Sequence, residues 1–375
     1  MQSKNAITLA KILATDFAER AADADKKGQL PSEDVAVLRK SGYLALSVSR
    51  ELGGQGLELR DCIAAHVILA EGSAATAMVA GMQIHVFGHE REVRSWRAEA
   101  YDRLCRAAVD GALVNSLASE PQLGSPSRGG LPATTAVAAA DGQSWRINGQ
   151  KTWSTGGSHL THMLVRCAVE DKARIILIEQ TRPGIRWEQT WQNALSLRAS
   201  DSNDVFFEDV LVPRENLIDV GKERHQGNIW FPMVMSAVYL GTAVAARNSV
   251  IQFALERVPT ALGRPIATLP KIQRQIGEID IALQAAQALL LEVAGEWQGD
   301  NAVRVKFLPR VAAAKTMVTE TANKVTEQAL QIAGGSSITG TLPLERFFRD
   351  VRAGSMQPPS GDTALEMVGR AALGQ

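Results

Sequence analysis

The side chains best suited to covalent or metal chemistry, three cysteines and six histidines, are scattered along this chain of 375 residues. Cys62, Cys105 and Cys167 are far apart and odd in number, and their spacing is not that of a metal site. We expect reduced, buried thiols and no bound metal. His85 lies in an Ala/Met-rich run, where an imidazole is more often structural than catalytic. The chain has no phosphate-binding glycine signature of the Rossmann or Walker A type, which argues against those nucleotide sites.

The charge balance makes some partners improbable. Lys plus Arg equal Asp plus Glu at 40 each, so net charge gives no long-range attraction for nucleic acid or anionic lipid. The first 20 residues carry charge throughout, and no stretch reaches the roughly 20 apolar residues of a membrane span. We therefore expect a cytoplasmic protein with no nucleic-acid partner and no membrane span.

The hydrophobic pattern of the sequence, which indicates the helices and strands that position these groups, changes twice along the chain. Apolar residues recur at helical spacing over about 6–108, interrupted by a glycine-rich loop over 47–59. The pattern over about 111–221 is typical of strands, and long Ala/Leu-rich helical runs follow Trp230. The sequence predicts an α+β multidomain protein. Its expected parts are an N-terminal all-α domain (1–111), a middle β-barrel or sandwich domain (112–222) and a C-terminal four-helix bundle (223–375).

Two dipeptides punctuate the β region. Asp141-Gly142 and Asn148-Gly149 flank a short run, and each is typical of a tight turn between strands. We therefore expect strands to end at both dipeptides.

Several segments, in this order, resemble the acyl-CoA dehydrogenase superfamily. Residues 119–125 (SEPQLGS) are similar to the family's Thr-Glu-Pro-Gly-Ala-Gly-Ser segment. Residues 148–155 (NGQKTWST) look like its Asn-Gly-X-Lys-X-Trp-Ile-Thr strand. Residues 331–335 (QIAGG) and 343–350 (PLERFFRD) are similar to its Gln-X-X-Gly-Gly and Pro-X-Glu-Arg-X-X-Arg-Asp motifs. The resemblance spans nearly the whole chain and implies the same three-domain fold.

The resemblance also implies FAD as the cofactor. In the family, the tryptophan of the strand motif packs on the flavin and the threonine hydroxyl meets its reactive edge, while a neighbouring subunit supplies contacts to the pyrophosphate and adenosine. Arg257 would be one of these contacts, although the spacing after it is lengthened and it could be an ordinary surface charge. Carried over residue by residue, the expected cofactor-binding residues are Ser119, Gly124, Ser125, Trp153, Ser154, Thr155, Arg257, Gln331, Gly334, Gly335 and Ser360.

One departure from the family bears on the reaction. Where the family places the glutamate that abstracts the substrate α-proton, this chain has Pro358. Val234 occupies the alternative position for the base, on the first helix of the bundle. Neither side chain can accept a proton, and general-base catalysis contributes roughly a hundred- to ten-thousand-fold in rate. Asp362 could swing in as a substitute base, although a helix N-cap role suits it better.

Three functions therefore stay open. The resemblance implies an FAD-dependent oxidoreductase that acts on an acyl-CoA or related acyl substrate at a CH–CH group. Flavin monooxygenases of the same fold also lack the glutamate. They accept reduced flavin, FAD or FMN, from a separate reductase, use O₂, and often place a histidine near the flavin, for which His85 is the candidate. The third possibility is a non-catalytic flavin-binding protein.

The expected partners follow from these functions. They are a small acyl or acyl-CoA substrate and either an electron-transfer partner or a flavin reductase. The Ala/Leu-rich helices are apolar on more than one face, which favours packing against a second subunit. The resemblance implies a homotetramer of paired dimers, with a dimer as the alternative.

Overall fold

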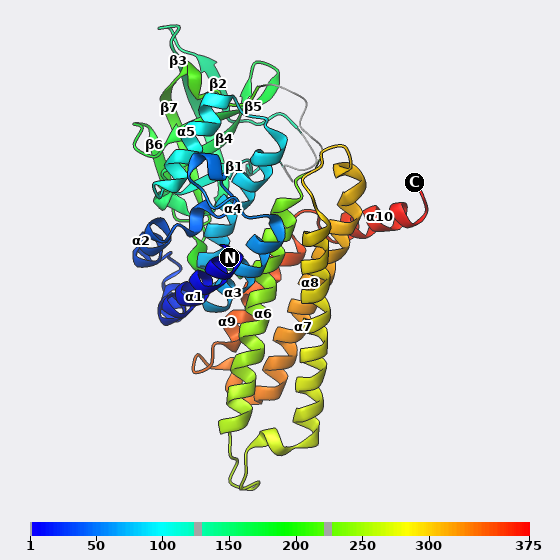
Figure 1. Cartoon of the computed structure of the whole chain (residues 1–375). Helices are drawn as coiled ribbons and strands as arrows, with labels where there is room; N and C mark the ends of the chain where they lie inside the picture. The colour runs from blue at the N-terminus through cyan, green and yellow to red at the C-terminus, as the bar shows by residue number, and fades with distance from the viewer. Residues whose placement is uncertain (1, 124–129, 221–226) are drawn as a thin grey trace.

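The computed structural model describes residues 2–123, 130–220 and 227–375. A β domain lies at one end of the molecule with α4 and α5 beside it, and the long helices α6, α7 and α8 extend away from it (Figure 1). The helices are α1 (Gln2–Lys27), α2 (Ser32–Ser41), α3 (Leu59–Gly72), α4 (Ala74–Val93), α5 (Ala98–Val109), α6 (Trp230–Glu256), α7 (Pro270–Glu296), α8 (Arg304–Ala333), α9 (Leu344–Asp350) and α10 (Gly361–Ala372). The strands are β1 (Val114–Leu117), β2 (Thr135–Ala138), β3 (Ser144–Ser154), β4 (His162–Val169), β5 (Lys172–Glu179), β6 (Ile185–Glu188) and β7 (Asn203–Pro213).

The order of the elements confirms the predicted fold class: helices, then strands, then helices. The boundary proposed between residues 111 and 112 falls between α5 and β1. The boundary proposed between residues 222 and 223 lies outside the described residues. The domain limits therefore remain a prediction of the sequence.

The strands form one seven-stranded sheet, in the order β1-β4-β2-β3-β7-β6, with β5 also paired to β4. Asp141-Gly142 connects β2 to β3, as expected. The prediction of a second turn at Asn148-Gly149 was wrong, because both residues lie within β3 at a shift in its register with β7. Asn148 exchanges hydrogen bonds with Asp209 of β7, and Gly149 adopts φ +144°. A bulge stabilised from the neighbouring strand has replaced the turn.

Helix α6 is the central element of the helical part. It packs against α3, α4, α7 and α8. Close approach depends on glycines: a Cβ on Gly88 of α4 would lie 2.3 Å from the Trp230 ring, and one on Gly241 would lie 2.1 Å from the Val67 carbonyl oxygen. Among the described helices, α6 alone is long and apolar enough to cross a membrane, but 72% of its apolar stretch is buried inside the molecule. Such burial is typical of a core helix.

The cysteines behave as the sequence predicts. All three are free and buried. Burial raises the pKa of each thiol, to about 11 for Cys105 and about 12 for Cys167, so they are protonated near neutral pH. Among residues 2–123, 130–220 and 227–375, no group of three His, Cys, Asp or Glu side chains could hold a metal ion.

Candidate functional site

A buried ion pair anchors the end of β3. Lys151 Nζ lies 2.5 Å from Glu120 Oε1, and neither side chain is more than 4% exposed. The backbone N–H groups of Ala133 and Thr134 also donate to the Glu120 carboxylate. Burial opposes ionisation of Glu120, but its hydrogen bonds from Lys151, Thr134 and Ala133 prevail and lower its pKa. The ionised pair holds the loop around residue 120 against β3, next to the tryptophan of the strand motif.

Trp153 presents its side chain to the outside. It is 60% exposed, although tryptophan is usually among the more buried residue types. Its backbone has φ +55°, in the left-handed region that non-glycine residues rarely adopt. The N–H of Thr155 donates to the Trp153 carbonyl oxygen at 2.9 Å, so the chain turns sharply behind the indole. A strained backbone that exposes a large flat aromatic surface is typical of a ligand-binding position.

Ser154 and Thr155 point polar groups into the buried region behind Trp153. Ser154 is fully buried, and its Oγ has no hydrogen-bond partner among the described residues. Thr155 Oγ1 lies 2.8 Å from Ser202 Oγ, which lies 2.8 Å from Ser200 Oγ. Asn115 Nδ2 donates to the Thr155 carbonyl oxygen at 2.9 Å. These bonds orient the Thr155 hydroxyl through a chain of side chains from the 198–202 segment.

His85 lies buried on α4, beside the start of α6. Its Nδ1 is 3.5 Å from Asn228 Nδ2, and its ring meets that of Phe231 edge-on, with centroids 5.0 Å apart. Its Nε2 is buried without a hydrogen-bond partner in the described part of the chain. Burial lowers the pKa of His85 to about 3, so the imidazole is neutral at physiological pH. The ring can therefore donate or accept one hydrogen bond at Nε2, depending on its tautomer.

The two positions at which the resemblance places a base carry the apolar residues Val234 and Pro358. Val234 is fully buried on α6 between Met233 and Met235, which are also buried. Pro358 is half-buried in the segment that leads into α10. Asp362 is exposed in the first turn of α10, where Ser360 rather than Asp362 occupies the N-cap position. The structure does not bring Asp362 into a buried site, so its role as a base remains a prediction.

The remaining expected contacts lie far from β3 within one chain. Arg257 follows the last residue of α6, and Gln331, Gly334 and Gly335 lie at the end of α8, all of them exposed. In Figure 1 these ends of α6 and α8 lie at the end of the bundle farthest from the β domain. A Cβ on Gly334 or Gly335 would meet nothing within 4 Å, so the backbone there is open to a ligand or a second chain.

The 119–125 loop is described only in part. Ser119 is half-buried, and its carbonyl oxygen accepts a hydrogen bond from the Thr152 N–H at 3.0 Å. Gly124 and Ser125 lie outside the described residues. The link between Ser119 and Thr152 brings the start of the loop alongside the Trp153 turn, as the resemblance implies.

The residues around β3 fit a flavin. Trp153 offers an exposed aromatic face, which suits a planar ring system. The Thr155 hydroxyl, oriented by Ser202, lies two residues further along the chain and suits the polar edge of such a ring.

Family models match the three parts of the chain in order. They are described as the acyl-CoA dehydrogenase N-terminal domain (residues 3–96), middle domain (116–210) and C-terminal domain (233–357). The Bacillus subtilis (strain 168) protein YdbM, whose name assigns it to the acyl-CoA dehydrogenases, is 35% identical over 94% of this chain and 92% of its own. The chain belongs to the acyl-CoA dehydrogenase superfamily. The expectation of an acyl-CoA dehydrogenase-like enzyme is thereby confirmed.

Solved structures share the fold of this superfamily member along its whole length. The nitrososynthase from Micromonospora carbonacea var. africana is 25% identical, with a TM-score of 0.84 over 100% of this chain and 97% of its own. The butyryl-CoA dehydrogenase of Megasphaera elsdenii is 22% identical, with a TM-score of 0.86 over 99% and 98%. TdsC from Paenibacillus sp. A11-2, solved with FMN and indole, is 23% identical, with a TM-score of 0.85 over 99% and 97%. The same architecture thus carries several activities.

Sequence reasoning missed the residues that support the site. Glu120 and Lys151 stand inside the recognised motifs, but nothing in a one-dimensional pattern pairs residues that far apart. Ser200 and Ser202 lie in the segment 197–202 (LRASDS), which also resembles a motif of the family, whereas Asn115 and Asn228 belong to no motif. A buried charge inside a strand, such as Lys151, was the one available signal, because such a charge requires a partner.

Proposed function

We propose that this chain is a flavin-dependent oxidoreductase whose flavin rests on the Trp153–Thr155 turn. The observation that carries the proposal is Trp153, which is 60% exposed on a strained backbone. A core tryptophan would be covered. The membership of the acyl-CoA dehydrogenase superfamily supports the same conclusion.

We further propose that the reaction is oxygen-dependent rather than an α,β-dehydrogenation. A base for dehydrogenation would be expected at position 234 or 358, but these residues are the buried Val234 and the half-buried Pro358. Asp362, the remaining candidate, is exposed. When bound in its reduced form, a flavin supplies two electrons to O₂, so that one oxygen atom enters the substrate and the other leaves as water. A separate flavin reductase would provide the reduced flavin, which could be FAD or FMN.

Each residue of the site has a task in this proposal. Trp153 would hold one face of the cofactor, and Thr155, oriented by Ser202, would offer it a hydroxyl. His85, neutral and desolvated, would donate or accept one hydrogen bond at Nε2 without adding charge to its buried surroundings. The apolar Val234 and Phe231 exclude water from the same region.

The second candidate function is oxidation of an acyl-CoA or related acyl substrate at a CH–CH group. The 35% identity to YdbM favours it, because the name of that relative assigns it to the acyl-CoA dehydrogenases. This function needs a proton acceptor from outside the two usual positions. Asp362 remains the candidate, provided that the segment before α10 moves it inward.

One experiment separates the two reactions. The purified, yellow protein is titrated anaerobically with a panel of acyl-CoA thioesters while the visible absorbance is followed. Bleaching by any thioester would overturn the oxygen-dependent proposal, and its loss in Asp362→Asn would identify the base. No bleaching, together with ¹⁸O from ¹⁸O₂ in the product of reductase-coupled turnover, is the result that we expect. Protein that binds no flavin at all would refute both functions.

We also propose that two copies of the chain complete each flavin site, within a cytoplasmic homodimer or homotetramer. Arg257 and Gln331–Gly335 are exposed at the bundle end far from Trp153, so one chain alone supplies only one wall. Trp153→Ala and Arg257→Ala should each lose flavin. If a site uses Trp153 of one chain and Arg257 of the other, co-refolding the two variants restores part of the flavin content. Co-refolding that restores none would place both residues in the same site of one chain.

A further inference from the structure

Asp350, the last residue of α9, lies where the three domains meet. It is 5% exposed. Its Oδ1 accepts a hydrogen bond from the N–H of Leu197 at 2.8 Å, and its carbonyl oxygen accepts one from Ser196 Oγ at 2.6 Å. Asp350 therefore holds the segment before β7 through both its side chain and its backbone. Neither bond is local, since more than 150 residues separate the partners.

The segment that Asp350 holds is strained. Leu197 and Asp201 adopt φ +55° and +46°, in the left-handed region, and η5 (Arg198–Ser200) lies between them. Two non-glycine residues in this region make the turn unfavourable by itself, so it persists only while its surroundings stabilise it. The bond from Leu197 to Asp350 begins this strained turn.

The far end of the same turn contacts the Trp153–Thr155 turn, where we propose that the flavin binds. Ser200 N–H donates to the Leu197 carbonyl oxygen at 2.9 Å, and the Ser200 carbonyl oxygen accepts from Gly156 N–H at 2.9 Å. Ser200 Oγ contacts Ser202 Oγ, which contacts Thr155 Oγ1, each at 2.8 Å. An unbroken series of hydrogen bonds thus joins Asp350 to Thr155. In the other direction, the chain runs from Asp350 through η9 (Val351–Ser355) to Pro358.

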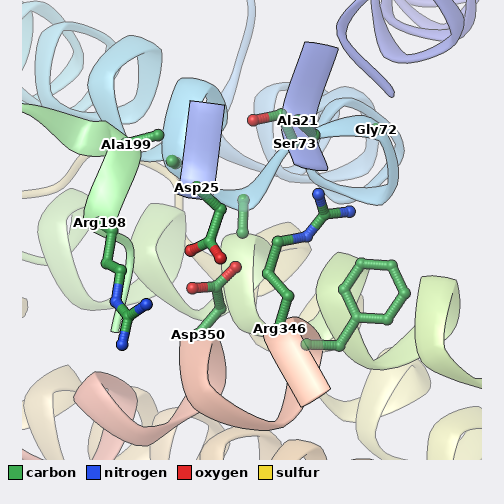
Figure 2. A pocket seen from close by; sticks show the side chains of 11 residues that line it. Ala21, Asp25, Gly72, Ser73, Arg198, Ala199, Arg346 and Asp350 are labelled. Atoms are coloured by element: carbon green, nitrogen blue, oxygen red, sulfur yellow. The ribbon is translucent and has the colours of Figure 1, made fainter. Parts of the chain in front are cut away.

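Charged groups crowd the Asp350 carboxyl. Figure 2 shows the carboxylates of Asp25 and Asp350 pointing toward one another, with Arg198 to one side and Arg346 to the other. Arg349 pairs with Asp25 at 2.5 Å and with Glu345, rather than with Asp350. Arg346 Nη1 is buried without a hydrogen-bond partner among the described residues. The titratable and charged groups that face Asp350 are Asp25 of α1, Arg198 of η5, Tyr239 of α6, and Arg346 and Arg349 of α9.

We propose that Asp350 is a positioning residue that couples the segment leading to Pro358 with the Thr155 hydroxyl, and that ionisation of its carboxyl, which makes it a stronger acceptor for Leu197 N–H, alters this coupling. The inference rests on the proposed function, because Thr155 matters only if a flavin binds beside it. Asp350 itself touches neither substrate nor cofactor in this arrangement. It acts by stabilising the strained 197–201 turn.

The direction of the pH effect follows from the surroundings of Asp350. Burial raises its pKa to about 7, against the Leu197 hydrogen bond, and Asp25 adds to the rise while Arg346 and Arg349 oppose it. Below that pH the carboxyl is neutral in the folded protein, while the unfolded chain already loses the proton near its usual value. Stability from this group therefore falls as the pH rises toward 7. Above pH 7, the buried, ionised carboxylate of Asp350 faces Asp25.

The test uses the flavin-bound protein and three variants. Asp350→Asn keeps an acceptor for Leu197 N–H but cannot ionise, and Asp350→Ala removes the acceptor. Glu71→Gln is the matched control, since the pKa of Glu71 is also raised by burial but Glu71 contacts nothing in the series. The visible flavin spectrum and the hydrogen exchange of the 196–202 amides are measured between about pH 5.5 and 8.5.

We expect the wild type and Glu71→Gln to show a spectral transition near pH 7 that Asp350→Asn lacks. In Asp350→Ala, the Leu197 amide should exchange at least about tenfold faster at every pH, with an altered flavin spectrum. A transition that persists in Asp350→Asn, or an unchanged Leu197 amide in Asp350→Ala, would overturn the inference. Wild-type protein that binds no flavin would refute the proposed function and the coupling together. A bound flavin whose spectrum does not titrate would refute only the coupling.

Discussion

Lys151 Nζ and Glu120 Oε1 form an ion pair, 2.5 Å long, inside the β domain, where water reaches neither side chain to any extent. The pair joins β3 to a loop that precedes it by about 30 residues, and it lies two residues before Trp153. The Trp153–Thr155 turn, where we propose that the flavin binds, is therefore held in place by a charge pair outside the proposed site.

Removal of the lysine should destabilise the protein strongly. Lys151→Met leaves the Glu120 carboxylate buried without its cation, which costs roughly 3–5 kcal/mol of unfolding free energy. Denaturant unfolding of the flavin-free protein measures the change. The double variant Lys151→Met/Glu120→Gln should lose less than the sum of the two single variants, because no unpaired charge remains. A loss below about 1 kcal/mol in Lys151→Met would contradict the pairing.

Trp153→Ala should abolish flavin binding and leave the fold almost unchanged. The side chain is 60% exposed, so little apolar burial is lost in the flavin-free protein. Flavin content per chain and the thermal midpoint of the flavin-free protein are the two measurements. Val137→Ala is the matched control, because Val137 on β2 is equally exposed and lies outside the proposed site. Equal flavin loss in both variants would show that Trp153 has no special role.

His85 should remain neutral down to acid pH. Its pKa is about 3, so its ¹⁵N imidazole resonances should not titrate between about pH 5 and 8. The unfolded chain takes up a proton at the usual histidine pKa, so the stability from neutral His85 is lost as the pH falls below about 6.5. His85→Phe should reduce the fall in thermal midpoint between pH 7 and 5. His159→Phe, at a more exposed position, serves as the comparison.

Two glycine substitutions should act in opposite directions. Gly241→Ala would put a Cβ 2.1 Å from the Val67 carbonyl oxygen, so α3 and α6 would have to separate, at a cost of roughly 1–3 kcal/mol. Gly277→Ala on α7 would meet nothing within 4 Å and should stabilise by up to about 1 kcal/mol through helix propensity. Chemical denaturation measures both. Equal effects would mean that α3 and α6 do not pack as closely as the structure has them.

The turn prediction illustrates where sequence reasoning reached its limit. Asp141-Gly142 and Asn148-Gly149 are equally good turn signals, yet only the first joins two strands. The second became a bulge because β7 supplies Asp209 as a partner for Asn148. Local propensity determined the glycine conformation, whereas the neighbouring strand determined whether the chain reversed.

The amino-acid sequence by itself determined the order of the helical and β regions, the family motifs and the missing carboxylate at Pro358 and Val234. These properties depend only on residue type and periodicity, which are visible in short stretches of the sequence. The tertiary structure alone decided which polar groups meet: Lys151 with Glu120, Thr155 with Ser202, and Asp350 with Leu197. Burial of a charge or hydroxyl costs free energy unless the group is paired, and these partners come from residues that are distant in sequence and meet only in the folded chain.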